Sequence, residues 1–295
     1  MPLDSAQLNA FAAVIDEGSF ERAAAVLHVT RSAVSQRVKL LEEMVGQVLV
    51  RRATPCTPTE AGQALYRHAR EVALSEADAL ATIGGGQRQS TRLAIGVNAD
   101  SLATWFPHAM SHAAQGHHIT FDIHVEDQDH SANLLREGRV MAAVTADPQP
   151  VQGCKVLPLG TLRYRALASP AFLQRHFAKG VNAAALGQAP MLVFNRKDAL
   201  QTRFVQRITR RPLAQPVHWL PEAHAFVMAT RAGLGWGMIP DPLAESDLKA
   251  GTLVELIAGK PVDVPLYWQY WRLNVQALHH MTGAVQSAAA QVLLP

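Results

Sequence analysis

The sequence predicts a mixed α/β protein, in which a small helical N-terminal part precedes a larger part of alternating strands and helices. Apolar residues in the first ninety positions recur at helical spacing, whereas short apolar runs alternate with helical segments after residue 91. A glycine- and glutamine-rich stretch at residues 84–90 separates the two parts as a linker would. At 295 residues, the chain is long enough for two or three domains.

The composition is that of a globular protein, with 48% hydrophobic and 17% charged residues. The net charge of +3 is too small to indicate a nucleic-acid partner by itself. The only cysteines, Cys56 and Cys154, exclude a disulfide-built secreted scaffold and a four-cysteine zinc site. We recognise no signal peptide and no membrane-spanning stretch, so we expect a cytoplasmic protein without membrane contact.

Three short helices are expected before residue 46. Asp4 is placed to cap the first, which Gly18 ends, and Ser19 and Thr30 are placed to cap the second and third. The third helix has a stripe of apolar residues at steps of three and four: Val34, Val38, Leu41 and Val45. Its opposite side carries only hydrogen-bond donors and small polar groups: Arg31, Ser32, Ser35, Gln36 and Lys39.

Two short helices joined by a tight turn, the second with such a donor-rich face, are typical of a helix-turn-helix that reads DNA. Arg and Lys match the acceptors of guanine, Gln matches adenine, and Ser reaches bases or phosphates. An ordinary three-helix core with a solvated polar face is the alternative, and the spacing alone does not separate the two. Residues 49–57 then predict two short strands around a turn, a wing in which Arg51 and Arg52 would contact the DNA backbone or minor groove.

A long helix follows the wing. Thr57 is placed to cap it, and it is expected to run to about Ile83, a length of roughly 39 Å at 1.5 Å per residue. Its apolar stripe is thin: Ala61, Leu65, Val72, Leu80 and Ile83. We expect the matching helix of a second subunit to cover this stripe, and packing on its own domain is the alternative.

After residue 91, helical and strand patterns alternate, which predicts a parallel sheet with helices on its faces. Strands are expected at 92–97, 119–125, 140–145, 191–194, 217–220, 236–239 and 264–270, and helices at 101–114, 130–137, 199–208, 224–232 and 274–293. A second unit begins near Tyr164, and the terminal helix is expected to return to the first unit. Two such lobes joined by a crossing chain form a cleft, as in periplasmic binding proteins.

Ligands of such sheets bind at the carboxyl ends of the strands. Seven residues are expected there: Asn98, Asp100, Ser101, Glu126, Asp127, Thr145 and Phe194. Ser101 is placed to cap a helix whose free N–H groups would bind a carboxylate, and the adjacent Glu126 and Asp127 suit a cationic side chain. Together they predict an amino acid with a basic tail, although Asp100 must turn away from its carboxylate or bind its α-amino group. Helix capping and a solvated acidic turn are the alternatives.

The block SFERAAAVLHVTRSAVSQRVKLLEEMVGQVLVRR, followed by PTEAG, resembles the winged helix-turn-helix of LysR-type transcriptional regulators. The resemblance covers essentially the whole chain. The strings VNADSLATW at 97–105, VED at 125–127 and MIP at 238–240 are most similar to the ArgP/LysG subgroup, the lysine- and arginine-responsive activators of basic amino-acid exporter genes.

The resemblance implies a homodimer paired through the long helix, two of which form a homotetramer that bends double-stranded operator DNA. RNA polymerase is a further expected partner, and no cofactor is expected. The family positions that match Arg31, Ser32, Ser35 and Gln36 contact DNA, as does a wing arginine. In the subgroup an acidic residue stands where this sequence has His224, and the nearest acid is Glu222. This departure leaves open a different effector, or the use of Glu222 through a shifted loop.

The sequence thus predicts a DNA-binding domain at 1–58, a dimerisation helix and hinge at 59–90, and an effector-binding domain at 91–295. Lobe I of that domain would comprise about 91–162 and 271–295, and lobe II about 163–270. An architectural or replication-origin DNA-binding protein with little effector response is the alternative. We expect no enzyme, because no nucleophile–base pair is visible, and no metal site, because His108 and His112 lack a third ligand at a recognised spacing.

Overall fold

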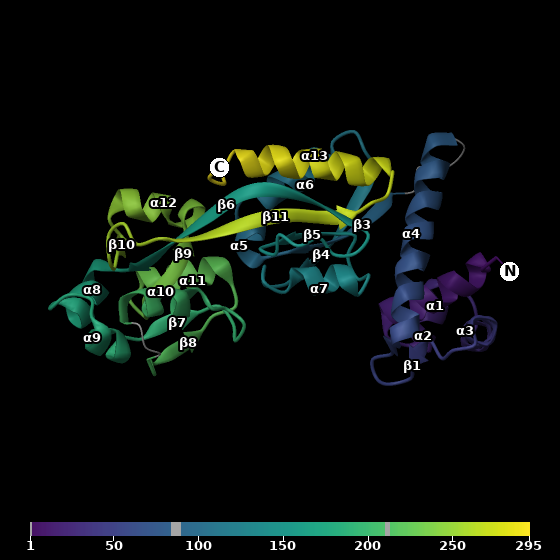
Figure 1. The fold of residues 1–295 in the computed structure, drawn as a ribbon, viewed down its shortest axis with the longest axis horizontal. Coiled ribbons are helices and arrows are strands. Elements are labelled where there is room, and N and C mark those ends of the chain that lie inside the picture. The colour runs from purple at the N-terminus through teal and green to yellow at the C-terminus, as the bar shows by residue number, and fades with distance from the viewer. Residues whose placement is uncertain (1, 84–89, 210–212) are drawn as a thin grey trace.

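The computed structural model describes residues 2–83, 90–209 and 213–295. It contains a small N-terminal domain, a long helix and an elongated α/β domain of two lobes (Figure 1). The mixed α/β class predicted from the sequence is confirmed, and all but the last residue of the predicted linker at 84–90 lies outside the described residues.

The N-terminal domain contains three helices and two short strands: α1 (Ser5–Glu17), α2 (Phe20–Val26), α3 (Arg31–Val45), β1 (Val50–Arg51) and β2 (Thr57–Pro58). The three predicted caps are confirmed, because the side chains of Asp4, Ser19 and Thr30 each accept a hydrogen bond from the backbone N–H three residues later. The apolar stripe of α3 is buried except at its last member, since Val45 is 38% exposed.

The long helix α4 (Glu60–Ile83) begins later than predicted. Thr57 does not cap it, because Thr57 pairs with Arg51 in the wing. Thr59 is the cap instead: its hydroxyl accepts from the N–H of Gly62 at 3.0 Å and donates to the carbonyl of Val48 at 2.7 Å. The cap therefore also fixes the wing to the start of the helix.

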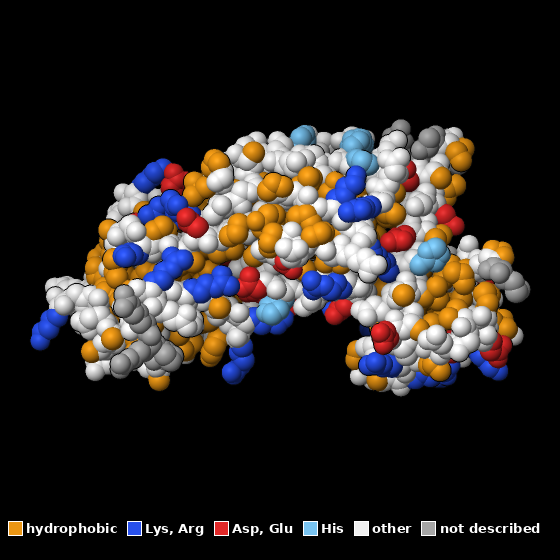
Figure 2. All heavy atoms as spheres, in the orientation of Figure 1, with side chains coloured by type: hydrophobic (Ala, Val, Ile, Leu, Met, Phe, Trp, Pro, Cys, Tyr) orange, Lys and Arg blue, Asp and Glu red, His pale blue; other side chains and the backbone are white. Residues whose placement is uncertain are grey.

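The predicted apolar stripe of α4 is only partly right: Ala61 and Leu65 are half-buried against the N-terminal core, but the residues that α4 buries most fully are others. Tyr66 and Ala69 belong to the core of the N-terminal domain, and Leu74 belongs to the core of the effector domain. Leu80 and Ile83 are 64% and 76% exposed at the far end of the helix. Figure 2 shows hydrophobic side chains along this end of α4 and over the N-terminal domain.

The main sheet of the α/β domain has the strand order β10-β6-β11-β5-β3-β4, with β9 added on β6. Its strands are β3 (Thr91–Val97), β4 (Ile119–Val125), β5 (Ala142–Thr145), β6 (Cys154–Ala168), β9 (Gly237–Pro240), β10 (Val254–Glu255) and β11 (Val262–Trp271). The prediction of a parallel sheet is only partly right, because β3 runs parallel to β4 and β5 while β11 runs antiparallel to β5 and β6. The long strands β6 and β11 run through both lobes (Figure 1).

The helices of lobe I lie on both faces of this sheet, with α6 and α13 together on one face and α7 on the other (Figure 1). They are α5 (Ala99–Ala103), α6 (Phe106–Ala114), α7 (Ser131–Arg136) and α13 (Gln276–Ala290). The single helix predicted at 101–114 is therefore wrong: Thr104, with φ −121° and ψ −86°, ends α5 before α6 begins. Trp268 and Trp271 of β11 are fully buried in the core.

Lobe II contains a second small sheet, in which two strands run parallel, and five helices. Its elements are α8 (Pro170–Phe177), α9 (Ala183–Gln188), β7 (Met191–Val193), α10 (Leu200–Thr209), β8 (Val217–Trp219), α11 (Ala223–Arg231) and α12 (Asp241–Ala250). The sequence analysis missed α8, α9 and α12. Loops after β7 and before α11 face the ends of β3 and β4 across the junction of the lobes.

Replacing Gly62 by Ala is expected to destabilise the N-terminal domain by roughly 1–3 kcal/mol, because a Cβ at this position would collide with the backbone carbonyl of Leu49. Gly283→Ala in α13 is the matched control, since a Cβ at this position meets open space. Alanine also removes the entropic cost of a helical glycine, so this variant should not be destabilised. Urea unfolding followed by circular dichroism measures both variants. A Gly62→Ala protein as stable as the parent would contradict this packing.

Candidate functional site

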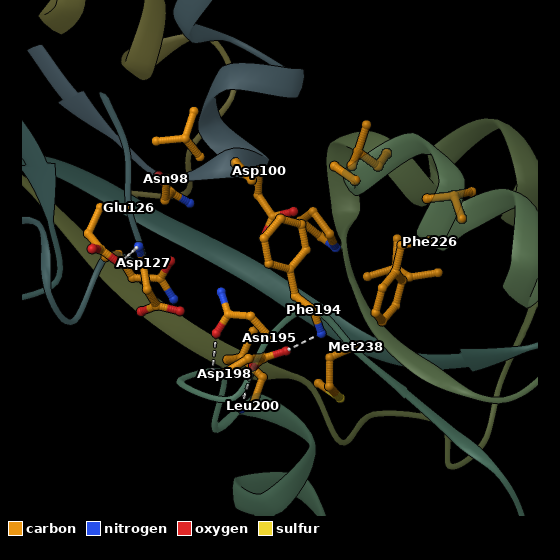
Figure 3. A pocket seen from close by; sticks show the side chains of 18 residues that line it. Asn98, Asp100, Glu126, Asp127, Phe194, Asn195, Asp198, Leu200, Phe226 and Met238 are labelled. Carbon is orange, nitrogen blue, oxygen red and sulfur yellow. Dashed lines mark hydrogen bonds between the residues drawn. The ribbon is translucent and has the colours of Figure 1, made fainter. Parts of the chain in front are cut away.

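A cavity of about 110 Å³ lies between the two lobes, where β3 and β4 end opposite the β7–α10 loop, α11 and β9 (Figure 3). Five of the residues predicted from the sequence line it: Asn98, Asp100, Glu126, Asp127 and Phe194. The carboxyl ends of the strands thus do meet at one cavity, and residues from both lobes surround it.

Asp100 is a half-buried residue whose carboxylate lines this cavity. The hydroxyl of Tyr164, on β6, donates a hydrogen bond to Asp100 Oδ2 at 2.7 Å. Burial raises the pKa of Asp100 to about 6, and the nearby charges of Asp198 and Asp127 add to the rise, while the Tyr164 hydrogen bond opposes it. Asp100 therefore sits in a site where a negative charge lacks a cationic partner.

Asp127 and Asp198 complete a group of three carboxylates around the cavity. Burial, followed by the charges of Asp129 and Asp198, raises the pKa of Asp127 despite a hydrogen bond from the Asp129 backbone. Asp198 accepts from the backbone N–H groups of Phe194 at 3.1 Å and Leu200 at 2.9 Å, which holds it at the end of β7. None of the described residues that line the cavity is a lysine or an arginine. The site therefore favours a cation.

Glu126 differs from the other acids because it already has a cationic partner. Lys197 Nζ, in the β7–α10 loop, lies 2.8 Å from Oε1 and 2.9 Å from Oε2. Burial alone would raise the pKa of Glu126, but the hydrogen bonds from Lys197 and from the Asp127 backbone N–H, together with the charge of Lys197, outweigh it and hold that pKa below its usual value. This ion pair joins lobe I to lobe II beside the cavity.

Asn98 contributes an amide that lacks a hydrogen-bond partner among the described residues. It is 2% exposed and precedes α5, yet its side chain does not cap that helix, and neither Nδ2 nor Oδ1 is paired. Buried amides in native proteins are normally hydrogen-bonded. An amide that lines a cavity and has no partner offers both a donor and an acceptor to a polar ligand.

Two predicted residues are buried outside the lining of the cavity. The prediction that Ser101 caps a helix is wrong, because Asn98 is the N-cap position and Ser101 lies buried inside α5. Thr145 is buried at the end of β5, where its hydroxyl donates to the carbonyl of Gln128 at 3.0 Å and accepts from the Asp147 N–H at 3.1 Å. Neither residue lines the cavity.

Glu222 and His224 are exposed at the start of α11 and do not line the cavity either. Glu222 caps that helix by accepting from the N–H groups of His224 at 3.0 Å and Ala225 at 2.6 Å. The sequence analysis missed Asp198 and Phe226, which do line the cavity. A signal for Asp198 was present, since it follows the end of a predicted strand by a few residues.

The predicted DNA-binding residues lie on one helix and the wing of the N-terminal domain. On α3, Ser35 is half-buried and the other members are exposed: Arg31, Ser32, Gln36 and Lys39. Arg31 pairs with Glu21 at 2.9 Å and Lys39 with Glu43 at 3.5 Å, both pairs well exposed. Such surface pairs contribute little, so phosphates can compete for these cations.

Both wing arginines, Arg51 and Arg52, are exposed, and the Arg52 guanidinium lies 5.2 Å from the centre of the Phe20 ring.

Within residues 2–83, 90–209 and 213–295, no three His, Cys, Asp or Glu side chains are grouped as a metal site requires. No helix in the same described ranges is both long and apolar enough to cross a membrane.

Replacing Asp100 by Asn is expected to stabilise the protein at about pH 7.5 by roughly 1–3 kcal/mol. The pKa of this carboxyl in the folded protein, about 6, lies above the value of 3.8 for a free side chain. Its ionisation therefore costs folding stability as the pH rises through that window, and the gain from Asn should shrink towards about pH 4.5. Thermal melts at both pH values measure the effect.

Asp263→Asn is the matched control for that variant. Hydrogen bonds from Arg163 hold the pKa of Asp263 below its usual value, so removing its charge should bring no gain at neutral pH. An Asp100→Asn protein that is no more stable than the parent at about pH 7.5 would show that this carboxylate is not destabilised.

Comparison with known proteins identifies the family. The model "Bacterial regulatory helix-turn-helix protein, lysR family" matches residues 5–63, and "LysR substrate binding domain" matches residues 86–292. The chain is 49% identical over 289 residues to the HTH-type transcriptional regulator LysG of Mycobacterium tuberculosis, covering 98% of this chain and 94% of the relative. It is 42% identical over 291 residues to the lysine export transcriptional regulatory protein LysG of Corynebacterium glutamicum, covering 98% and 99%.

A solved structure matches the fold over the whole chain. It is full-length LysG from Corynebacterium glutamicum with bound effector Arg, with a TM-score of 0.80 and 41% identity over 99% of this chain and 100% of that one. Two family models and relatives of 42–49% identity over nearly the whole chain therefore agree on one family. The chain belongs to the LysR family, whose members are transcriptional regulators and not enzymes.

Proposed function

We propose that this regulator binds operator DNA in a sequence-specific way, responds to a basic amino acid, lysine or arginine, and controls an amino-acid exporter gene. The observation that carries the effector class is the group Asp100, Asp127 and Asp198 around one cavity whose described lining holds no lysine or arginine. Burial is the main cause of the raised pKa of Asp100 and Asp127, and the neighbouring carboxylates add to it; a cationic side chain would stabilise the charged form of both. LysG of Corynebacterium glutamicum supports this proposal, because its structure contains bound arginine and its name is that of a lysine export transcriptional regulatory protein.

The effector would be held at both ends. The three carboxylates suit its cationic side chain, and the unpartnered amide of Asn98 suits its α-amino or carboxylate group. The proposed set is therefore the cavity-lining group: Asn98, Asp100, Glu126, Asp127, Phe194 and Asp198. It leaves out Ser101, Thr145, Glu222 and His224, which do not line the cavity.

For DNA we propose that α3 enters the major groove and that the wing contacts the backbone. The proposed contacts are Arg31, Ser32, Ser35, Gln36, Lys39, Arg51 and Arg52. The proposed division of the chain is 1–58 for DNA binding, 59–90 for dimerisation and 91–295 for the effector. The exposed Leu80 and Ile83 at the end of α4 support a homodimer, since a partner helix would cover them.

We further propose that two dimers assemble into a tetramer, that it works in the cytoplasm, and that it contacts RNA polymerase. An effector that binds one arrangement of the lobes more tightly would shift how the tetramer holds DNA. The cavity between the lobes favours a regulator that responds to an effector over an architectural protein with little effector response.

Binding should be confined to basic amino acids. In isothermal titration calorimetry with each of the twenty amino acids, lysine and arginine are expected to bind, because only they carry a permanent side-chain cation. Norleucine and citrulline, their neutral analogues, are expected to bind at least tenfold more weakly, as roughly 1.4 kcal/mol of lost charge interaction requires. Equal binding of either neutral analogue would overturn the cationic effector.

Replacing Gln36 by Ala should weaken operator binding by roughly 1–3 kcal/mol and leave binding to random duplexes nearly unchanged, because a glutamine that reads a base edge matters only on the right sequence. Fluorescence anisotropy on the upstream DNA and on a scrambled duplex measures both. Gln291→Ala, an exposed glutamine at the end of α13, is the matched control. An equal loss on both duplexes would argue against base reading by Gln36.

A further inference from the structure

Two ion pairs join lobe I to lobe II beside the cavity. Lys197 of the β7–α10 loop pairs with Glu126, and Arg203 of α10 pairs with Asp129 at 2.9 Å. The two pairs differ in one respect: Glu126 lines the cavity and Asp129 does not. Only the first pair therefore neutralises a carboxylate that a ligand could reach.

The ammonium group of Lys197 lies within 2.9 Å of both oxygens of Glu126, and the backbone N–H of Asp127 also donates to Oε1 at 2.9 Å. Lys197 is therefore the cation that a ligand must replace to pair with this carboxylate. Its loop is held in place, because Asn195 Oδ1 accepts from the backbone N–H of Lys197 at 2.7 Å and of Asp198 at 3.1 Å. The side chain itself remains 49% exposed. It is therefore a tethered cation that can leave Glu126 without disturbing a core.

We propose that Lys197 is a specificity-determining residue that competes, from within the chain, with the cationic group of the effector for Glu126. The proposal rests on the basic amino-acid effector argued above. The ammonium that Lys197 presents is the same chemical group that a lysine effector carries. An effector that uses Glu126 must first displace it, so Lys197 lowers the affinity of the site for basic amino acids.

The effect of this competition on effector affinity can be expressed as a fold-change. An ion pair exposed to this extent contributes little, so its removal should tighten the binding of lysine and arginine by roughly two- to five-fold. Norleucine carries no cation and cannot use the freed carboxylate, so its binding should not tighten. Selectivity for lysine over norleucine should therefore rise when Lys197 loses its charge.

Isothermal titration calorimetry on the full-length protein tests this with Lys197→Met, Lys197→Gln, Arg203→Met and the double variant Lys197→Met/Glu126→Gln. Both Lys197 variants are expected to bind lysine and arginine two- to five-fold more tightly than the parent. The double variant should lose this gain, because the carboxylate that Lys197 releases is absent. Arg203→Met breaks the other interlobe pair without freeing a cavity carboxylate, so it should show no gain.

Several outcomes would overturn the inference while leaving the effector class intact: unchanged or weaker binding in both Lys197 variants, a gain that survives in the double variant, or an equal gain in Arg203→Met. Weaker binding would instead assign Lys197 to the effector's carboxylate, and an equal gain would assign the effect to loosening of the lobes. A parent protein that binds neither basic amino acid would overturn the proposed function and this inference together.

Discussion

The packing of α4 into two separate hydrophobic cores is the constraint that joins the DNA-binding surface to the effector cleft. Tyr66 and Ala69 are buried in the N-terminal domain, and Leu74, less than two turns further on, is buried in the effector domain. Arg67 strengthens the second contact: it donates to the carbonyl of Gln152 at 2.8 Å and lies 5.4 Å from the centre of the Trp271 ring. A stiff helix that packs against both domains along its first two thirds couples the orientation of one domain to that of the other.

The other end of this connection is β11, which begins at Val262 in lobe II and ends at Trp271 beneath Arg67. Because β11 and β6 run through both lobes, any opening or closing around the cavity must bend these strands (Figure 1). The bulge in their pairing at Leu266 and Tyr267 marks a place where the pair departs from regular register. A change in the arrangement of the lobes would therefore reach α4 through β11 and its contact with Arg67. An effector that binds one arrangement more tightly raises the population of that arrangement.

Local signals predicted the parts of this fold that depend on neighbouring residues. The caps Asp4, Ser19 and Thr30 were found because each bonds to an amide three residues away. Thr57 was misassigned because its pairing with Arg51 depends on how the chain folds back at the wing. Likewise the acids at the ends of β3 and β4 were found from strand ends. Asp198 also follows a predicted strand end, but that strand is in the other lobe, and its place beside these acids depends on how the two lobes meet. Ser101 failed for a local reason: α5 starts one residue after Asn98, and this left the serine inside the helix.

The charge arrangement of the cavity explains how a site built mainly from carboxylates can select its ligand. Burial, with a smaller contribution from the neighbouring carboxylates, raises the pKa of Asp100 and Asp127, so their negative charge is unfavourable in this site. The Tyr164 hydrogen bond and the backbone donors around Asp198 offset only part of that cost. A neutral ligand would leave the repulsion in place and also bury the carboxylates further from water, whereas a cation relieves it. Selectivity thus comes from the instability of the empty site as much as from contacts in the filled one.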